Sequence, residues 1–276
     1  MRKGKLIQGG AFLSTMALLL AGCGGSGGEA SLSAPGVAPT IVGGTPVSEG
    51  AYPAQVALLS KSQSNVYQAQ FCGGTLISNQ WVITAAHCVQ GTAASAIDIG
   101  VGITNLPNGP APEKRVAVSS IKVHPSYNGS TNVNDVALIK LASTVSQRPL
   151  PYAGPTRGSL YNPGTTAVAV GWGATSEGGP YPTQMYKVNL PLVDDATCAS
   201  AYSGFSNDAM VCAGNVASGG IDTCQGDSGG PLMVNGVLIG LTSFGIGCAR
   251  PGYPGVYTEV KTYASFIQST TGVAPY

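Results

Sequence analysis

Charged side chains are scarce in this chain, and those present are balanced in sign. Only 9% of the 276 residues are charged, with 13 lysines and arginines against 12 aspartates and glutamates, so the net charge is +1. A protein that binds nucleic acid usually has an excess of lysine and arginine, and a large net charge of one sign generally accompanies partners of the opposite charge. The composition therefore predicts no nucleic-acid partner.

Histidine is rarer still, and the cysteines lack the spacing of a metal site. The chain has only His87 and His124, and no two cysteines are separated by two residues. Structural zinc sites are commonly built from such cysteine pairs together with further cysteines or histidines. We therefore expect neither a metal nor another cofactor.

The sequence also lacks an apolar run long enough to cross a bilayer. Its leader has an apolar stretch at residues 11–20 behind a positively charged stretch at residues 1–5, which is typical of a signal peptide. The tetrapeptide Leu-Ala-Gly-Cys at 20–23 resembles a bacterial lipobox. We predict a signal peptide at 1–22 and a lipid on Cys23 that anchors an exported bacterial protein at the cell envelope, its only membrane contact. Cleavage by an ordinary signal peptidase is the alternative.

Glycine and proline, by contrast, are abundant. Residues 23–40, after the leader, are rich in glycine, serine and proline and predict a flexible linker. The chain has 40 glycines and 19 prolines, and glycine destabilises helix interiors by about 1 kcal/mol relative to alanine. Short apolar runs recur between turn residues, which favours an all-β barrel or sandwich. They lie at 55–59, 74–77, 81–84, 116–123, 136–141, 167–170, 187–192, 231–234, 237–243 and 255–260.

Only the last segment predicts a substantial helix. Residues 261–269 place Tyr263, Phe266 and Ile267 at a helical spacing.

The cysteines after the leader form an even set, which indicates disulfides in an exported chain but leaves their pairing open. They are Cys72, Cys88, Cys198, Cys212, Cys224 and Cys248.

The candidate chemistry centres on Ser228, which lies in Gly-Asp-Ser-Gly-Gly at 226–230. A serine hydroxyl becomes a good nucleophile only when a base takes its proton. His87 directly follows an apolar run at residues 81–86, so we expect it to be this base. The Gly-x-Ser-x-Gly pattern also occurs at the nucleophile of α/β-hydrolases. Those enzymes place histidine after the serine, whereas both histidines here precede it, so that class is excluded.

Six motifs, in the same order, resemble those of the trypsin-like serine proteases of the chymotrypsin fold, from residue 41 to about residue 267. They are Ile-Val-Gly-Gly at 41–44, Thr-Ala-Ala-His-Cys at 84–88, Asp-Val-Ala-Leu at 135–138, Gly-Trp-Gly at 171–173, Asp-Thr-Cys-Gln-Gly-Asp-Ser-Gly-Gly-Pro at 222–231 and Pro-Gly-Val-Tyr at 254–257. The resemblance implies two six-stranded antiparallel β-barrels, at 41–150 and 151–276, with the active site between them and a C-terminal helix. It also implies the disulfides Cys72–Cys88, Cys198–Cys212 and Cys224–Cys248.

The resemblance further assigns catalytic roles. It implies Ser228 as nucleophile, His87 as base, Asp135 as the carboxylate that orients the base, and an oxyanion hole formed by the amides of Gly226 and Ser228. His124 precedes a proline in a turn, and we interpret it as structural. The implied activity is hydrolysis of peptide bonds in proteins or peptides, by a monomer.

Substrate specificity follows from a second set of positions. The resemblance places Asp222 at the floor of the pocket, where a carboxylate selects arginine or lysine. Gly245 and Gly255 match small pocket walls, and Ser243 is expected to hydrogen-bond Asp135. Phe244 departs from the tryptophan that is commoner in the family, which leaves the neighbouring subsite preference open.

Two further features concern activation and calcium. In the family, proteolysis frees an amine at the position of Ile41, which pairs with the aspartate at the position of Asp227. Here Thr40 precedes Ile41, so we expect a different protease to make this cut, which also releases the domain from its anchor. Residues 91–112 contain one acid, Asp98, so we expect no family-type calcium site.

Two rival interpretations stand beside this one. A protease-fold lipoprotein without activity would bind protein partners, but the intact Ser228, His87, Asp135 and Asp227 argue against it. A broad esterase, or a protease of non-basic specificity, would keep the fold. The carboxylate of Asp222 argues against non-basic specificity.

Overall fold

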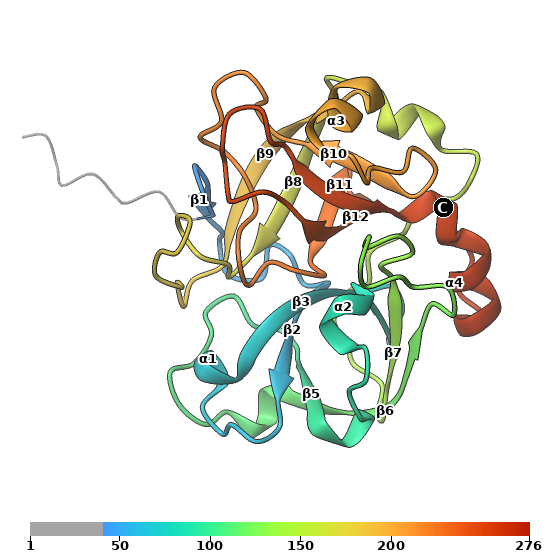
Figure 1. Ribbon diagram of the computed structural model, residues 1–276. Coiled ribbons are helices and arrows are strands. Elements are labelled where there is room, and N and C mark those ends of the chain that lie inside the picture. The colour runs from blue at the N-terminus through green and yellow to red at the C-terminus, as the bar shows by residue number, and fades with distance from the viewer. Residues whose placement is uncertain (1–40) are drawn as a thin grey trace, which may run out of the picture. The chain divides into compact units, whose positions relative to one another are not determined.

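The computed structural model describes residues 41–276, and it confirms the all-β fold with two closed six-stranded antiparallel barrels and a short C-terminal helix (Figure 1). The predicted signal peptide, the lipidation of Cys23 and the linker at 23–40 lie outside the described residues. Within these residues, no helix is long and apolar enough to cross a membrane.

The first barrel closes in the order β2-β3-β4-β7-β6-β5. Strand β2 of this barrel contributes side chains to two hydrophobic clusters. Val56 and Leu58 point into the barrel, whereas Ala57 and Leu59 pack outward against a cluster that includes Trp172 of the second barrel. A strand buried on both faces is continuously apolar rather than alternating. The strands are β2 (Gln55–Ser60), β3 (Gln70–Leu76), β4 (Trp81–Thr84), β5 (Ile97–Gly100), β6 (Arg115–Val123) and β7 (Ala137–Leu141).

The strands of the second barrel pair in the order β9-β10-β13-β12-β11-β8. Pairing of β8 with β9 closes the barrel. A tight turn at Asn235 and Gly236, both with positive φ, joins β11 to β12. The short strand β1 (Thr45–Pro46) adds to the outer edge of β9. The barrel strands are β8 (Thr166–Gly171), β9 (Tyr186–Val193), β10 (Met210–Ala213), β11 (Pro231–Val234), β12 (Val237–Phe244) and β13 (Gly255–Glu259).

Helices are few, but the prediction of a single substantial helix was wrong. The C-terminal helix α4 (Ala264–Thr271) packs Ala264 and Ile267 against Leu138 of the first barrel. The missed helix, α3 (Asp195–Ala201), begins where the Asp194 side chain accepts a hydrogen bond from the Thr197 amide at 2.8 Å. Strands β1, β5 and β10 were missed as well. The other helices are α1 (Val66–Ala69), α2 (Ala86–Val89), η1 (Ala94–Ala96), η2 (Pro112–Lys114), η3 (Gly158–Tyr161) and η4 (Val260–Tyr263).

All three disulfides implied by the resemblance are present: Cys72–Cys88, Cys198–Cys212 and Cys224–Cys248. The first ties β3 to α2, the second ties α3 to β10, and the third joins two loops of the second barrel. Such bonds form in oxidising surroundings, which agrees with an extracellular protein.

The two barrels meet where the loop around Ser228 lies on β3 and the end of β4. The Gly73 amide donates to the Ser228 carbonyl at 2.8 Å, and the Thr84 hydroxyl donates to the Gly73 carbonyl at 2.8 Å. Gly229 has a φ of +76°, and a Cβ there would collide with the Thr84 hydroxyl and lie 2.6 Å from the Gly73 carbonyl. This close approach of the barrels therefore requires glycine at 229.

Replacing Gly229 by alanine should destabilise the protein through this contact. Gly236→Ala is the matched control, because Gly236 has a nearly equal φ of +74° but open space around it. Both variants share the backbone strain, whereas only Gly229→Ala also overpacks the interface, so it should lose about 1–3 kcal/mol more stability in urea denaturation. Equal losses in the two variants would contradict the proposed packing constraint.

Candidate active site

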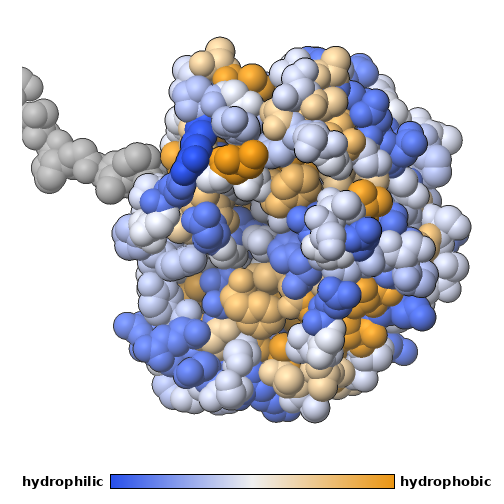
Figure 2. Space-filling view, viewed as in Figure 1, coloured by the Kyte–Doolittle hydropathy of each residue, from blue (hydrophilic) through white to orange (hydrophobic). Residues whose placement is uncertain are grey.

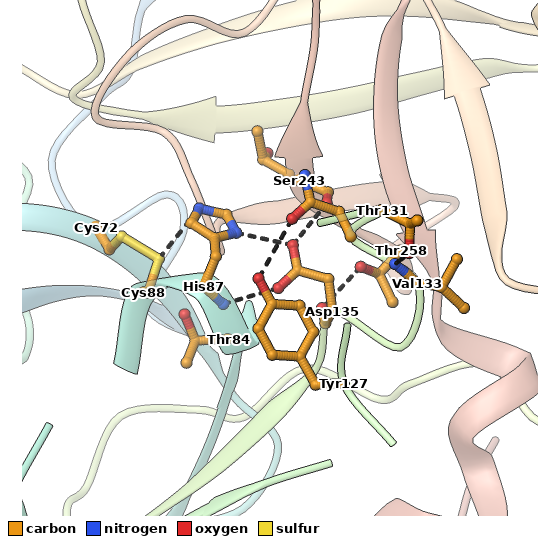
Figure 3. Close-up of polar contacts among 12 residues, drawn as sticks. Cys72, Thr84, His87, Cys88, Tyr127, Thr131, Val133, Asp135, Ser243 and Thr258 are labelled. Atoms are coloured by element: carbon orange, nitrogen blue, oxygen red, sulfur yellow. Dashed lines mark hydrogen bonds and ion pairs between the residues drawn. A yellow bond between two sulfur atoms is a disulfide. The ribbon is translucent and has the colours of Figure 1, made fainter. Parts of the chain in front are cut away.

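His87 and the buried Asp135 form a hydrogen-bonded pair where the two barrels meet. His87 lies in α2, next to Cys88 of the first disulfide, and Asp135 lies just before β7. The Asp135 carboxylate accepts from the His87 amide at 2.8 Å and contacts the His87 ring Nδ1 at 2.7 Å. Figure 3 shows the imidazole between the disulfide and this carboxylate. The two bonds fix the direction in which the ring points.

The second barrel completes the hydrogen bonding of Asp135. The Ser243 hydroxyl, on β12, donates to the same carboxylate at 2.6 Å, and the Thr258 hydroxyl, on β13, donates to the Asp135 carbonyl at 2.8 Å (Figure 3). Asp135 is fully buried. A buried carboxylate is tolerated where hydrogen bonds replace its lost water, so the contacts from both barrels support a charge in the cleft.

Ser228 lies beside this pair, on the second barrel's side of the cleft. It lines one pocket together with Ser243, and its neighbour Gly229 packs against Thr84 and Ala85, just before α2. Among residues 41–276, no hydrogen bond joins the Ser228 hydroxyl to His87. Such a bond often forms only when substrate is present. The structure thus links His87 and Asp135 directly, and Ser243 connects this pair to the pocket that Ser228 lines.

Two backbone amides of the Ser228 loop are free to bind an anion. Within the described part of the chain, neither the Gly226 amide nor the Ser228 amide donates to a protein acceptor. The Gly226 carbonyl is held from the other side by the side-chain amide of Gln70, at 2.9 Å. Gly226 has a φ of +96°, which glycine adopts readily.

Asp222 lies in the pocket that Ser228 borders. Phe244, Gly245 and Gly255, which the sequence assigned to substrate binding, are among the other lining residues. One Asp222 carboxylate oxygen accepts from the Ala249 amide at 3.0 Å, but the other, Oδ1, has no hydrogen-bond partner among residues 41–276. Burial raises the pKa of Asp222 to about 6. A Cβ at position 255 would lie 2.7 Å from the unpartnered oxygen, so glycine keeps access to it open.

An ion pair that sequence reasoning missed lies next to Gly247, which lines this pocket. The Arg250 guanidinium donates to the Glu177 carboxylate, with Nε at 2.8 Å from Oε2, although the two residues are 73 positions apart. The Cys248 amide points toward the same carboxylate, at 3.4 Å. Tyr202 contacts Phe244 edge-to-face on the adjoining wall. No local sequence pattern could have indicated either contact.

Asp227 is a second buried carboxylate that has no cationic partner in the described part of the chain. It is 1% exposed and accepts from the amides of Gly173 at 2.8 Å and Cys224 at 3.0 Å. Burial raises the pKa of Asp227 to about 7. Ile41 is fully buried, and Val42 packs against a cluster that contains Cys224. The start of the predicted domain therefore lies next to the residues that surround Asp227.

Other possible sites are occupied by protein contacts. Cys72, His87 and Cys88 have ligand atoms within 4.8 Å of one another, but the two cysteines are joined in a disulfide and cannot bind metal as thiolates. Asp98 is paired with Arg115, with Nε at 3.1 Å from Oδ2. The ring of His124 packs against two aromatic side chains, at Tyr263 and Phe266.

Figure 2 shows the face seen in Figure 1, where hydrophilic and hydrophobic residues are interspersed over both barrels. No single broad hydrophobic area covers this face of residues 41–276.

Comparisons with known proteins agree with this geometry. The family model described as Trypsin matches residues 41–267. The chain is 42% identical to Trypsin I-P1 of Gallus gallus over 231 residues, which cover 83% of this chain and 88% of that protein. It is 42% identical to a trypsin of Saccharopolyspora erythraea over 223 residues (81% and 94%) and 40% identical to a trypsin of Sus scrofa over 233 residues (83% and 95%). From the site and these matches together, the chain belongs to the trypsin family and is a trypsin-like serine endopeptidase.

Proposed function

We propose that this enzyme cleaves peptide bonds after arginine or lysine through a Ser228–His87–Asp135 triad, and that cleavage before Ile41 activates it. The observation that supports the specificity most directly is the unpartnered carboxylate oxygen of Asp222. It lies in the pocket bordered by Ser228. A buried anion without a partner is costly, and a guanidinium or ammonium group entering the pocket removes that cost.

In the proposed mechanism, the Ser228 hydroxyl attacks the scissile carbonyl while Nε2 of His87 takes its proton. Asp135 holds the other ring nitrogen at 2.7 Å and stabilises the imidazolium that forms. The free amides of Gly226 and Ser228 donate to the developing oxyanion, where one such donor contributes about 3–4 kcal/mol in other serine proteases. The imidazolium then protonates the leaving amine, and water hydrolyses the acyl-enzyme by the same steps.

The pocket walls account for the rest of the proposed specificity. Gly245 and Gly255 leave room for a long side chain to reach Asp222. The backbone of residues 243–245, at the end of β12, would pair with an extended substrate as an added strand. Phe244 supplies an apolar surface beside the cleft, supported by Tyr202.

Activation would give Asp227 a cation, which it lacks among residues 41–276. A cut between Thr40 and Ile41 creates an amine next to the residues around Asp227, and the new ion pair would order the Gly226–Ser228 amides. Because Thr40 is not basic, a protease of different specificity would make the cut. The proposed organisation is a signal peptide at 1–22, a lipidated Cys23 with a linker to residue 40, and barrels at 41–150 and 151–276. The cut would then free a monomeric domain from the bacterial envelope.

The first test compares a protein that begins at Ile41 with one that keeps residues 23–40, using matched arginine, lysine, phenylalanine and alanine chromogenic peptides. We expect rapid cleavage of the arginine and lysine peptides by the Ile41 form alone. Ser228→Ala in that form should lower kcat by about 10⁶-fold, as in other serine proteases. If neither form cleaves any of the peptides although its disulfides are formed, the result would favour a non-catalytic binding protein. Sequencing of naturally activated enzyme that begins elsewhere would reject the Ile41 switch.

Asp222→Ser tests the pocket separately from the triad. It should lower kcat/KM for the arginine peptide by about 10⁴-fold, because the cationic side chain loses its buried partner. Reaction of Ser228 with a small sulfonyl fluoride should be retained. Asp208→Ser, which removes an exposed carboxylate, is the matched control. Unchanged arginine cleavage by Asp222→Ser would show that the pocket assignment is incorrect.

The uncleaved chain should lose stability as the pH rises. The folded-state pKa of Asp227, about 7, lies above its ordinary value of 3.8, so the folded state binds more protons between about pH 4 and about pH 7. Asp222 acts in the same direction, with its pKa of about 6. In a Ser228→Ala background, Asp227→Asn should therefore flatten the fall in melting temperature across this window, and cleavage before Ile41 should do likewise. Parallel profiles with and without Asp227→Asn would contradict this account.

A further inference from the structure

Ala249 has an unusual backbone conformation beside the carboxylate of Asp222. Its φ is +57°, in the left-handed region that residues with a side chain rarely adopt. In this conformation its amide donates to Oδ2 of Asp222 at 3.0 Å. The other oxygen, Oδ1, has no hydrogen-bond partner among residues 41–276. The backbone at Ala249 thus occupies one oxygen of Asp222 and leaves the other for a ligand.

The segment around Ala249 forms part of the pocket wall. Gly247 and Cys248, which precede it, both line the pocket, and Cys248 is tied to Cys224 by a disulfide. The Ala249 carbonyl accepts from the Gly220 amide at 2.9 Å. A strained residue persists only where the surrounding structure holds it in place. The contacts of residues 247–250 therefore determine whether the Ala249 amide reaches Asp222.

Glu177, in the loop between β8 and β9, contacts this segment before and after Ala249. Its carboxylate accepts from two nitrogens of the Arg250 guanidinium, with Nε at 2.8 Å from Oε2. The Cys248 amide lies 3.4 Å from the same Oε2. A Cβ on Gly247 would collide with the guanidinium and lie 2.5 Å from the carboxylate, so the ion pair packs directly on the backbone of the pocket wall.

The Glu177–Arg250 pair is exposed, which limits its strength and makes it sensitive to salt. The side chains of Arg250 and Glu177 are 51% and 40% exposed. Most exposed ion pairs contribute little to stability, but a bidentate arginine–carboxylate contact is the geometry in which they do contribute. The hydrogen bond from Arg250 lowers the pKa of Glu177, so the carboxylate is charged at neutral pH. Salt should weaken the pair by screening it.

We infer that Glu177 is a positioning residue for substrate specificity. By holding Arg250 and the Cys248 amide, it keeps the pocket wall in the conformation in which Ala249 donates to Asp222. Neither Glu177 nor Arg250 lines the pocket in the described part of the chain, so the effect passes through the wall. The role in recognising arginine or lysine rests on the proposed function, whereas the role in holding Ala249 does not. Loss of Glu177 should weaken substrate binding rather than slow the chemistry at Ser228.

Amide hydrogen exchange, measured by NMR in the full-length protein carrying Ser228→Ala, tests the conformational part. Glu177→Met and Arg250→Met each remove a charge but keep an unbranched side chain. Each should raise the exchange rate of the Ala249 amide about fivefold, because local opening becomes easier. Salt at about 1 M should do the same in the parent protein. The Gly229 amide, which donates to the Thr242 carbonyl at 2.8 Å, is the internal reference and should not change.

Glu113→Met, at an exposed position of η2 in the first barrel, is the matched control and should leave the Ala249 amide unaffected. Unchanged exchange at Ala249 in both Glu177→Met and Arg250→Met would overturn the inference, whatever peptides the enzyme cleaves. Faster exchange at Gly229 as well would indicate general destabilisation and would also overturn it.

Kinetics of the enzyme cleaved before Ile41 test the effect on specificity. Glu177→Met and Arg250→Met should each raise KM for the arginine peptide about fivefold with kcat unchanged, and the double variant should be no worse than either single variant. A direct attraction between Glu177 and the cationic substrate would instead move KM in opposite directions in the two single variants. Opposite directions, additive losses or a fall in kcat would overturn the inference. A parent enzyme that fails to cleave the arginine peptide would reject the proposed function, and the exchange result would still stand.

Discussion

The hydrogen bonding of one buried carboxylate, that of Asp135, depends on both barrels and holds the site together. The first barrel supplies the His87 amide and ring, and the second supplies the Ser243 hydroxyl. The Thr258 hydroxyl, also from the second barrel, holds the backbone carbonyl of Asp135. An ionised group without these donors would be strongly disfavoured in an interior with no exposed surface. The imidazole of His87 can therefore be oriented correctly only when the two barrels are docked correctly. Gly229 permits the close approach of the barrels on which this depends.

Three buried aspartates differ in how far the protein itself satisfies them. Asp135 receives donors from two barrels, whereas Asp222 and Asp227 accept backbone hydrogen bonds but have no cation beside them among residues 41–276. Burial accordingly raises the pKa of Asp222 to about 6 and that of Asp227 to about 7. In the proposed function, the missing cations arrive later, one on the substrate and one on the new amine of Ile41. In that proposal, recognition and activation share one physical basis, because each supplies a cation to a buried carboxylate that lacks one among residues 41–276.

Much about this protein was predictable from the sequence alone, because the deciding signals are local. Short apolar runs between turn residues located most of the strands, the helical spacing near residue 266 located α4, and the motifs around His87, Asp135 and Ser228 indicated a serine protease. The resemblance also supplied the three cysteine pairings that the structure confirms. Strand β5 was missed because Asp98 interrupts its apolar residues, and α3 was missed because its start depends on the capping side chain of Asp194 rather than on an apolar pattern. Only the tertiary structure could decide which polar groups remain unsatisfied among residues 41–276, such as the free oxygen of Asp222 and the uncompensated carboxylate of Asp227. It also decided which groups pair over a long distance in the chain, as Glu177 does with Arg250. Burial and hydrogen bonding between residues far apart in the chain are properties of packing, and no local pattern of residues encodes them.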